Sequence, residues 1–142
     1  MLKPEGYTIR FPVEGGPAGK HGSVAFDDKL WKSFGKAPEK GKAQIEAIMK
    51  MWCRFGPSDL PESKFKFQDR YEKGGKGVRI DEFKGWQVRF YGTTVEVDGK
   101  PMFLVTGADL AKKRTRADPD ILNAAGKAAY NLVYPEKNRP KK

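Results

Sequence analysis

The sequence predicts an α+β fold in which two N-terminal helices pack on a small antiparallel sheet and a C-terminal helix completes the domain. Apolar residues recur at three- and four-residue steps across residues 39–55, as on one face of a helix. Asp98-Gly99 separates two runs rich in β-branched and aromatic residues, which is typical of a β-hairpin. Asp118-Pro119 is a strong start signal for a further helix.

The composition is that of a basic, folded chain. Its 142 residues suffice for one domain with a single core, and 12% aromatic residues are too many for a disordered chain. The formal net charge is +10, which favours a polyanionic partner through counterion release. We therefore expect nucleic acid as a partner, ahead of an acidic protein or a charge that serves only solubility.

Cysteine usage and apolar content indicate the compartment. Cys53 is the only cysteine, which excludes an intramolecular disulfide and argues against a thiol-ligated metal site. No apolar run is long enough for a signal peptide at the start or for a membrane span later in the chain. The sequence therefore predicts a cytoplasmic protein without metal or other cofactor.

The N-terminal residues predict short extended segments. Residues 7–13 form a candidate strand, and Pro12 within it favours an edge strand or an extended arm. Residues 1–22 are therefore interpreted as an N-terminal extension or an extra edge strand, and residues 23–26 as a brief strand. His21, the sole histidine, is interpreted as a solvated loop residue rather than a general base.

Two helices are expected next. Asp27-Asp28 marks the start of the first, which Gly35 and Pro38 end. The second covers residues 39–55. An apolar stripe along one face of such a helix usually packs in the core. The apolar positions are Leu30, Trp31 and Phe34 in the first helix, and Ile45, Ile48, Met49, Trp52 and Phe55 in the second.

The sheet is predicted as a meander of strands 78–84, 86–97 and 100–110. Pairing outward from the turn sets Val97 opposite Lys100 and Tyr91 opposite Thr106. Alternation predicts a core face formed by Trp86, Val88, Phe90, Phe103 and Val105. The other face then contains Gln87, Arg89, Tyr91, Thr93, Leu104 and Thr106.

Residues 64–67 alternate lysine and phenylalanine, a pattern with two interpretations. The phenylalanines could stack on bases while Lys64 and Lys66 hold phosphates. Alternatively, the segment is an amphipathic edge strand with its aromatic side in the core. The second interpretation is favoured, because period-two alternation is itself the signal for a strand.

A run of cations, residues 112–116, joins the last predicted strand to the final helix. Such runs are usually solvated, but this one lies at a strand-to-helix junction beside the polar face of the sheet, which favours a functional role. Asp118 is the expected N-cap of the helix that follows. One domain is expected over residues 23–134, with a basic, disordered tail over 135–142.

The stretch from Phe83 to Tyr130 resembles the HigB-like, phage-associated branch of the RelE/ParE toxin superfamily. The residues that carry the resemblance are Trp86, Arg89, the turn at 97–100, the apolar strand 102–105, Lys112-Lys113, and Ile121, Ala124 and Ala125. The resemblance implies a RelE-like fold with a curved sheet. It also implies the toxin of a toxin–antitoxin system, a metal-independent endoribonuclease that cuts ribosome-bound mRNA and is neutralised by an antitoxin protein.

The resemblance and the positions of the cations together suggest the site. Cleavage of RNA through the ribose 2′-hydroxyl needs cations for the charge at phosphorus and groups that transfer protons. The candidate catalytic residues are Arg89, Tyr91, Lys113 and Arg116. The candidate nucleic-acid-binding residues are Lys64, Lys66, Arg79, Lys112, Lys113, Arg114 and Arg116.

Two other functions remain open at this point. A ParE-like inhibitor would bind a protein target such as gyrase and needs no general acid or base, and the absence of a histidine near the cations favours it. A phage or mobile-element protein that binds nucleic acid without cleaving it is the third hypothesis.

Overall fold

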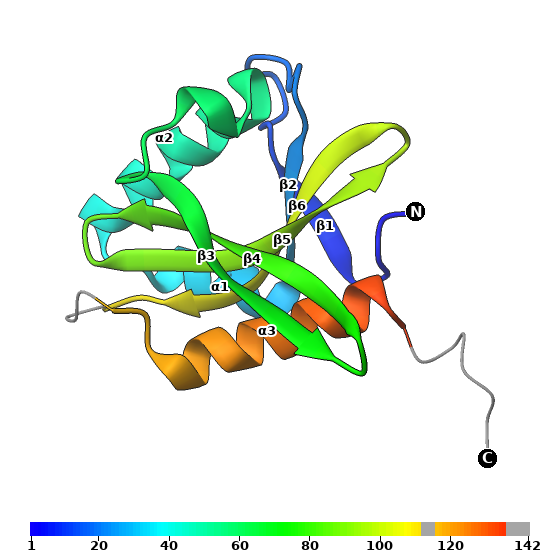
Figure 1. Cartoon of the computed structure of the whole chain (residues 1–142). Coiled ribbons are helices and arrows are strands. Elements are labelled where there is room, and N and C mark those ends of the chain that lie inside the picture. The colour runs from blue at the N-terminus through cyan, green and yellow to red at the C-terminus, as the bar shows by residue number, and fades with distance from the viewer. Residues whose placement is uncertain (112–115, 136–142) are drawn as a thin grey trace.

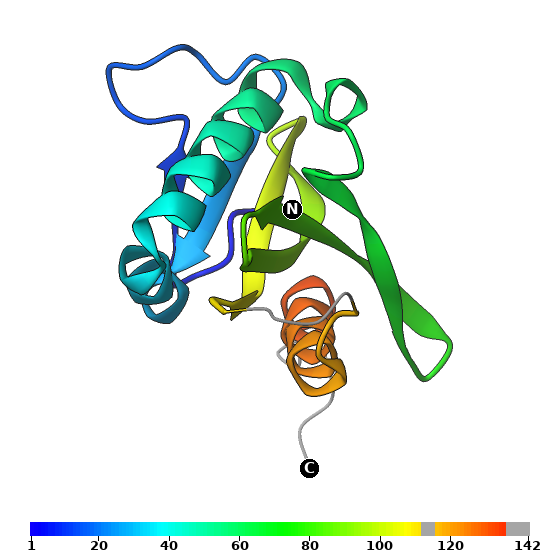
Figure 2. The same ribbon diagram turned by 90° about the vertical axis from the view of Figure 1, so that its left-hand side faces the viewer.

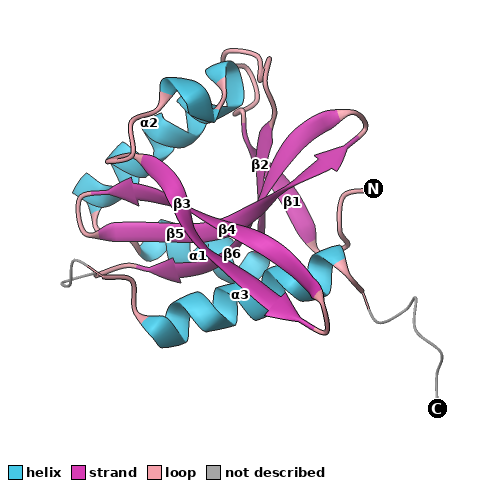
Figure 3. Cartoon of the chain, viewed as in Figure 1, coloured by secondary structure: helices cyan, strands magenta, loops and turns pink. Residues whose placement is uncertain are grey.

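The computed structural model describes residues 1–111 and 116–135, which form one mixed β-sheet with helices on both faces (Figures 1 and 2). Helices α1 and α2 cover one face, and α3 crosses the other (Figure 3). In the described residues the strand order is β1-β2-β6-β5-β4-β3. The elements are β1 (Tyr7–Phe11), β2 (Ser23–Asp27), α1 (Asp28–Lys36), α2 (Glu39–Phe55), a 3₁₀ turn η1 (Pro57–Asp59), β3 (Phe65–Lys73), β4 (Lys76–Gly85), β5 (Val88–Val97), β6 (Lys100–Asp109) and α3 (Pro119–Val133).

The predicted fold class is wrong in its N-terminal part, because strands and not helices come first. β1 and β2 form an antiparallel pair before α1, and β2 runs parallel to β6, so the sheet is mixed rather than antiparallel. Both strands belong to the core, since Phe11 is 1% exposed and Phe26 is fully buried. The prediction failed here because such short strands join the sheet only through β6, far along the chain.

The helices lie where local signals predict them. Asp27 caps α1, and its side chain accepts a hydrogen bond of 2.7 Å from the backbone nitrogen of Leu30. α2 spans Glu39–Phe55, as predicted. Asp118 caps α3 by accepting hydrogen bonds from backbone nitrogens of its first turn. No helix among the described residues combines the length and apolarity needed to cross a membrane.

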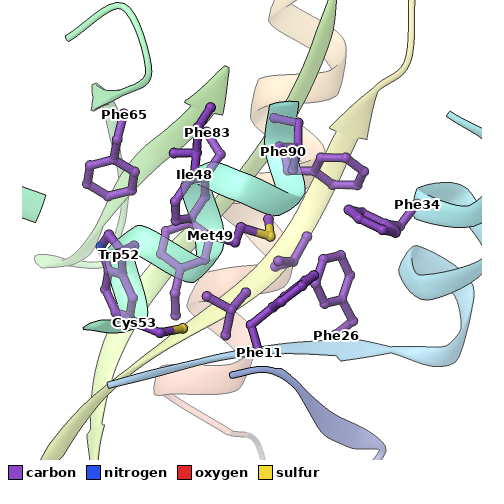
Figure 4. Packing of buried hydrophobic residues seen from close by; sticks show 14 of the residues in the cluster. Phe11, Phe26, Phe34, Ile48, Met49, Trp52, Cys53, Phe65, Phe83 and Phe90 are labelled. Atoms are coloured by element: carbon purple, nitrogen blue, oxygen red, sulfur yellow. The ribbon is translucent and has the colours of Figure 1, made fainter. Parts of the chain in front are cut away.

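The larger core lies between the sheet and the helices α1 and α2, and aromatic rings dominate it (Figure 4). The rings meet edge to face, as between Phe83 and Phe103, whose centroids are 4.8 Å apart with planes at 81°. The predicted core positions Val88, Phe90, Phe103 and Val105 are all fully buried. Phe55, at the last position of α2, does not join this core and is 49% exposed.

A second core covers much of the face that the sequence predicts to be polar. Ala125 and Ala129 of α3 are fully buried against the sheet, together with Tyr91. The helix approaches closely because small residues face it: a Cβ on Gly107 would lie 2.6 Å from that of Ala125. The charged residues of this face therefore gather nearer the β4–β5 turn.

The register of the β5–β6 hairpin is confirmed next to its turn and shifts farther out. Val97 pairs with Lys100 as predicted, but an irregularity after Gly92 sets Tyr91 opposite Gly107 instead of Thr106. The Thr106 hydroxyl donates a hydrogen bond of 2.9 Å to the backbone oxygen of Ala125. Thr106 thus fastens α3 to the sheet on the face to which alternation assigns it, although its partner across β5 differs from the predicted one.

Trp86 is not a core residue, in contrast to its predicted position. It occupies the two-residue turn between the paired residues Gly85 and Val88, with a φ angle of +52° and 43% of its surface exposed. Beside the same end of β4, the alternation at 64–67 proves to be the start of an edge strand. Phe65 of that strand is buried in the core.

Candidate functional site

The candidate site is a group of polar residues on the α3 face of the sheet, called here the Glu82 cluster. It lies at the end of the sheet close to the β4–β5 turn, where the strands place their side chains in two rows. Lys66 of β3, Glu82 of β4 and Tyr91 of β5 pair in the first row, and Lys84 and Arg89 pair in the second. Opposed residues of paired strands lie close enough for their side chains to interact. The members are Lys66, Gln68, Glu82, Lys84, Arg89 and Tyr91.

Glu82 is the centre of this cluster and is only 1% exposed. Its Oε1 accepts a hydrogen bond of 2.6 Å from Nε2 of Gln68. Its Oε2 lies 3.7 Å from Nε of Arg89, which is an ion pair too long to be a hydrogen bond. Neither Oε2 nor this Nε has a hydrogen-bond partner. A buried carboxylate with one free oxygen is costly to maintain, which makes it a marker of function.

The guanidinium of Arg89 is held in place by the turn beside it. Its Nη1 donates hydrogen bonds to the backbone oxygens of Trp86 and Val88, at 2.8 and 3.0 Å. The side chain is 12% exposed, so part of the guanidinium reaches solvent while the rest faces Glu82. A planar, permanently charged group fixed in this way is suited to bind a phosphate through two hydrogen bonds.

Tyr91 is the member of the cluster that is fully buried. Burial raises the pKa of its phenol, and the negative charges of Glu82 and Asp109 raise it further. Its hydroxyl makes no hydrogen bond of ordinary geometry, but it lies close to the Glu82 carboxylate, and this contact also raises the pKa. Tyr91 therefore contributes a neutral hydroxyl to the floor of the site and remains protonated at neutral pH.

Lys84 is the cation of the cluster whose pKa is lowered. Desolvation lowers its pKa, and the positive charges of Lys66 and Arg89 lower it further, while Glu82 opposes the shift. The side chain is half-buried and faces the same side of the sheet as its cross-strand neighbour Arg89. A lysine that releases its proton more readily than usual can take part in proton transfer.

An open groove of about 1030 Å³ leads to the cluster between β3 and the beginning of α3. Lys66 and Gln68 line it from the strand, and Arg116 lines it from the segment before the helix. Through Gln68, the groove therefore touches a residue that is hydrogen-bonded to Glu82. The groove also contains the acidic residues Asp69, Glu72 and Asp120, so its charge is mixed.

The structure brings some of the predicted site residues together and separates others. Arg89, Tyr91 and Lys66 belong to the Glu82 cluster, and Arg116 lines the adjoining groove. The backbone oxygen of Lys64 accepts a hydrogen bond from the backbone nitrogen of Lys84, which places Lys64 next to the cluster. The predicted site residues Lys112, Lys113 and Arg114 lie outside the described residues.

Arg79 lies on the opposite face of the sheet from the cluster. Its Nε donates a hydrogen bond of 2.9 Å to Asp81, and its guanidinium lies 4.7 Å from the centre of the Phe67 ring. Alternation along β4 accounts for this position, because Arg79 and Glu82 are an odd number of residues apart. Arg79 is thus separated from the other predicted nucleic-acid-binding residues.

Sequence reasoning missed Gln68, Glu82 and Lys84. A usable signal exists for two of them, since alternation over 78–84 places Glu82 and Lys84 on one face, and adjacent pairing puts that face beside Arg89. Gln68 lies on the same strand face as Lys66, at the point where the β3–β4 register shifts between Phe67 and Asp69. No sequence pattern predicts that irregularity. Within the described ranges, no three side chains of His, Cys, Asp or Glu gather as a metal site would require.

No protein-family model, curated protein or solved structure matches this chain. The resemblance to the RelE/ParE superfamily therefore stays a prediction.

Proposed function

We propose that the chain is a metal-independent endoribonuclease whose reaction takes place at the Glu82 cluster. The observation that carries the proposal is a carboxylate with a free oxygen, an immobilised arginine and a lysine of lowered pKa on one face beside an open groove. In this proposal, the physiological setting is that of a RelE-like toxin. Its substrate is ribosome-bound mRNA, and an antitoxin protein is its inhibitor.

The proposed reaction is a transesterification within the RNA strand. The 2′-oxygen of a ribose attacks the adjacent phosphorus, and the bond from phosphorus to the 5′-oxygen of the next nucleotide breaks. The products are a 2′,3′-cyclic phosphate and a free 5′-hydroxyl. The free Oε2 of Glu82 accepts the proton of the 2′-hydroxyl, and the ammonium of Lys84 donates a proton to the departing oxygen. No oxidant or reductant is needed.

The cations of the cluster stabilise the charge that develops at phosphorus. Arg89 is positioned before the substrate binds, because two backbone oxygens hold its Nη1. A fixed cation of this kind loses little entropy when the phosphate binds. Lys66 and Arg116 line the groove and can hold neighbouring phosphates of a single strand. Gln68 is a positioning residue that orients Glu82.

A second function has an observation of its own in its favour. Glu82 is 1% exposed and Tyr91 is fully buried, so a substrate reaches this carboxylate only if the side chains around it move. A non-enzymatic, ParE-like inhibitor would need only the exposed cations, with Glu82 holding Arg89 in position. Binding without cleavage would distinguish this alternative.

The test is a cell-free translation reaction in which the cut sites on a reporter mRNA are mapped by primer extension. The wild-type protein should produce cuts with 2′,3′-cyclic phosphate ends. Arg89→Ala should slow cutting by about 10²–10³-fold, the usual effect of removing one charge-stabilising donor. Glu82→Gln, which keeps the size and an acceptor oxygen, should slow it by about 10²–10⁴-fold through loss of the proton acceptor.

Lys50→Ala is the matched control, because Lys50 is an exposed cation of α2 paired with Glu46. It should cut like the wild type. If Glu82→Gln and Arg89→Ala also cut like the wild type, the cluster is not the active site. If the wild type cuts no mRNA but still arrests translation or growth, the ParE-like alternative replaces the nuclease.

A further inference from the structure

Trp86 combines three properties that core packing does not explain. Its backbone has a φ angle of +52°, a conformation that residues with side chains rarely adopt. It is the first residue of a two-residue turn, a position at which glycine is usual when φ is positive. Its large apolar side chain is nonetheless 43% exposed. An unfavourable backbone that displays an aromatic ring to solvent is a reason to seek a function.

The turn that carries the Trp86 ring also holds the guanidinium of Arg89, which the proposed reaction uses. The backbone oxygen of Trp86 accepts a hydrogen bond of 2.8 Å from Nη1 of Arg89, so the ring and the guanidinium belong to one tight turn. The ammonium of Lys40, in the first turn of α2, lies 5.8 Å from the centre of the ring. An exposed aromatic ring close to a cation is a combination that binds the base and the phosphate of a single-stranded nucleotide.

The turn is also rigid, which is required of a residue that positions a substrate. A Cβ on Gly85 would lie 2.9 Å from Cβ of Gln44 and 3.1 Å from the backbone nitrogen of Ile45. α2 therefore packs directly against the backbone that precedes Trp86. The ring therefore extends from a turn whose first strand packs against α2.

We propose that Trp86 is a stacking platform for a base of the RNA strand, adjacent to the phosphate bound by Arg89. The proposal rests on the nuclease function and adds a residue that holds the base. Stacking accepts any base, so Trp86 contributes affinity and register on the strand rather than a sequence preference.

The test compares two uncleavable 2′-O-methyl probes of equal length, oligouridine and a strand of abasic residues, by fluorescence anisotropy. Both probes carry the same phosphates, so only the bases differ. The wild type should bind oligouridine about tenfold more tightly than the abasic strand, a difference typical of one base stacked on an aromatic ring. Trp86→Gly should bind both probes with equal affinity, and Trp86→Phe should keep part of the preference.

Trp86→Gly is the informative variant, because glycine adopts a positive φ without strain and the turn should remain folded. Its melting temperature should equal or exceed that of the wild type. Phe55→Ala, which removes another exposed aromatic ring close to a cation, should retain the full preference for oligouridine. If Trp86→Gly keeps the preference, the stacking role is wrong and the nuclease proposal is unaffected. If the wild type binds neither probe, the stacking role is wrong, and the nuclease proposal is decided by the mRNA cleavage reaction.

Discussion

Asp81 makes the stability of the fold depend on pH. The residue is 5% exposed, and burial raises the pKa of its carboxyl group above the usual 3.8, although the hydrogen bond from Arg79 and its positive charge oppose the shift. Between the pKa of the unfolded chain and the raised pKa of the folded state, the folded state binds more protons. The free energy of unfolding must therefore fall as the pH rises through this interval.

Asp81→Asn should remove that contribution. Relative to the wild type, the variant should gain stability as the pH rises from about 4 through the raised pKa, because asparagine does not ionise. Urea denaturation at a series of pH values measures the difference in the free energy of unfolding. Asp59→Asn, at an exposed position, is the control. If the difference in the free energy of unfolding between Asp81→Asn and the wild type stays constant or shrinks as the pH rises, burial does not penalise the ionised form of Asp81.

At the level of single residues, sequence reasoning found the exposed and partly exposed cations more readily than the carboxylate they surround. Alternation correctly places Arg89 and Tyr91 on one face. It also places Glu82 and Lys84 there, but their partnership depends on how β4 pairs with β5, which a strand pattern alone does not state. The exposed position of Trp86 could not be predicted either, because the turn between β4 and β5 lacks the Asn-Gly or Asp-Gly signal of the next hairpin.

Among the elements, α1 and α2 each contain a glycine, and the two glycines should respond oppositely to alanine. Nothing lies within 4 Å of a Cβ built on Gly35 of α1. A Cβ on Gly41 of α2 would meet Cγ2 and Cβ of Val88, which is fully buried. Helix propensity favours alanine at both positions, but only Gly35 has room for it.

Gly35→Ala should therefore stabilise the protein by about 0.5–1 kcal/mol. Gly41→Ala should destabilise it by about 1–3 kcal/mol, since overpacking outweighs propensity. Thermal or urea unfolding of the two variants measures both effects, and each variant serves as the control for the other. Equal stabilisation by both substitutions would mean that α2 is free to move away from β5.

Elements with local signals were the predictable ones. The apolar period of α2, the cap at Asp118 and the Asp98-Gly99 turn each depend on a few neighbouring residues, and all three are confirmed. The parallel pairing of β2 with β6 has no local signal, and this is where the predicted fold class is wrong. The register irregularity between Tyr91 and Gly92 was not predicted, because no local sequence signal marks it. It lies where α3 packs on the sheet and Thr106 donates a hydrogen bond to Ala125.

At the scale of the whole molecule, Cys53 reports on global unfolding. The thiol is 1% exposed between α2 and the sheet, and burial raises its pKa to about 12. Both effects suppress the reactive thiolate while the protein is folded. Labelling with a thiol reagent at pH 8 should therefore be slow in buffer and fast in urea, with the same midpoint as the loss of circular dichroism.

Cys53 is the sole cysteine, so the labelling signal has no other source. Rapid labelling of the folded protein would contradict the packing of α2 shown in Figure 4. Labelling that begins below the midpoint of global unfolding would instead indicate that α2 detaches from the sheet while the rest stays folded.

The parallel pairing of β2 with β6 also determines when the protein can fold during its synthesis. β1, β2, α1 and α2 leave the ribosome well before β6, the strand to which β2 binds. Until β6 emerges, no strand joins β1 and β2 to β3, β4 and β5, so the nascent chain exposes part of its future core. A pause in translation before β6 emerges from the ribosome should therefore prolong an aggregation-prone state.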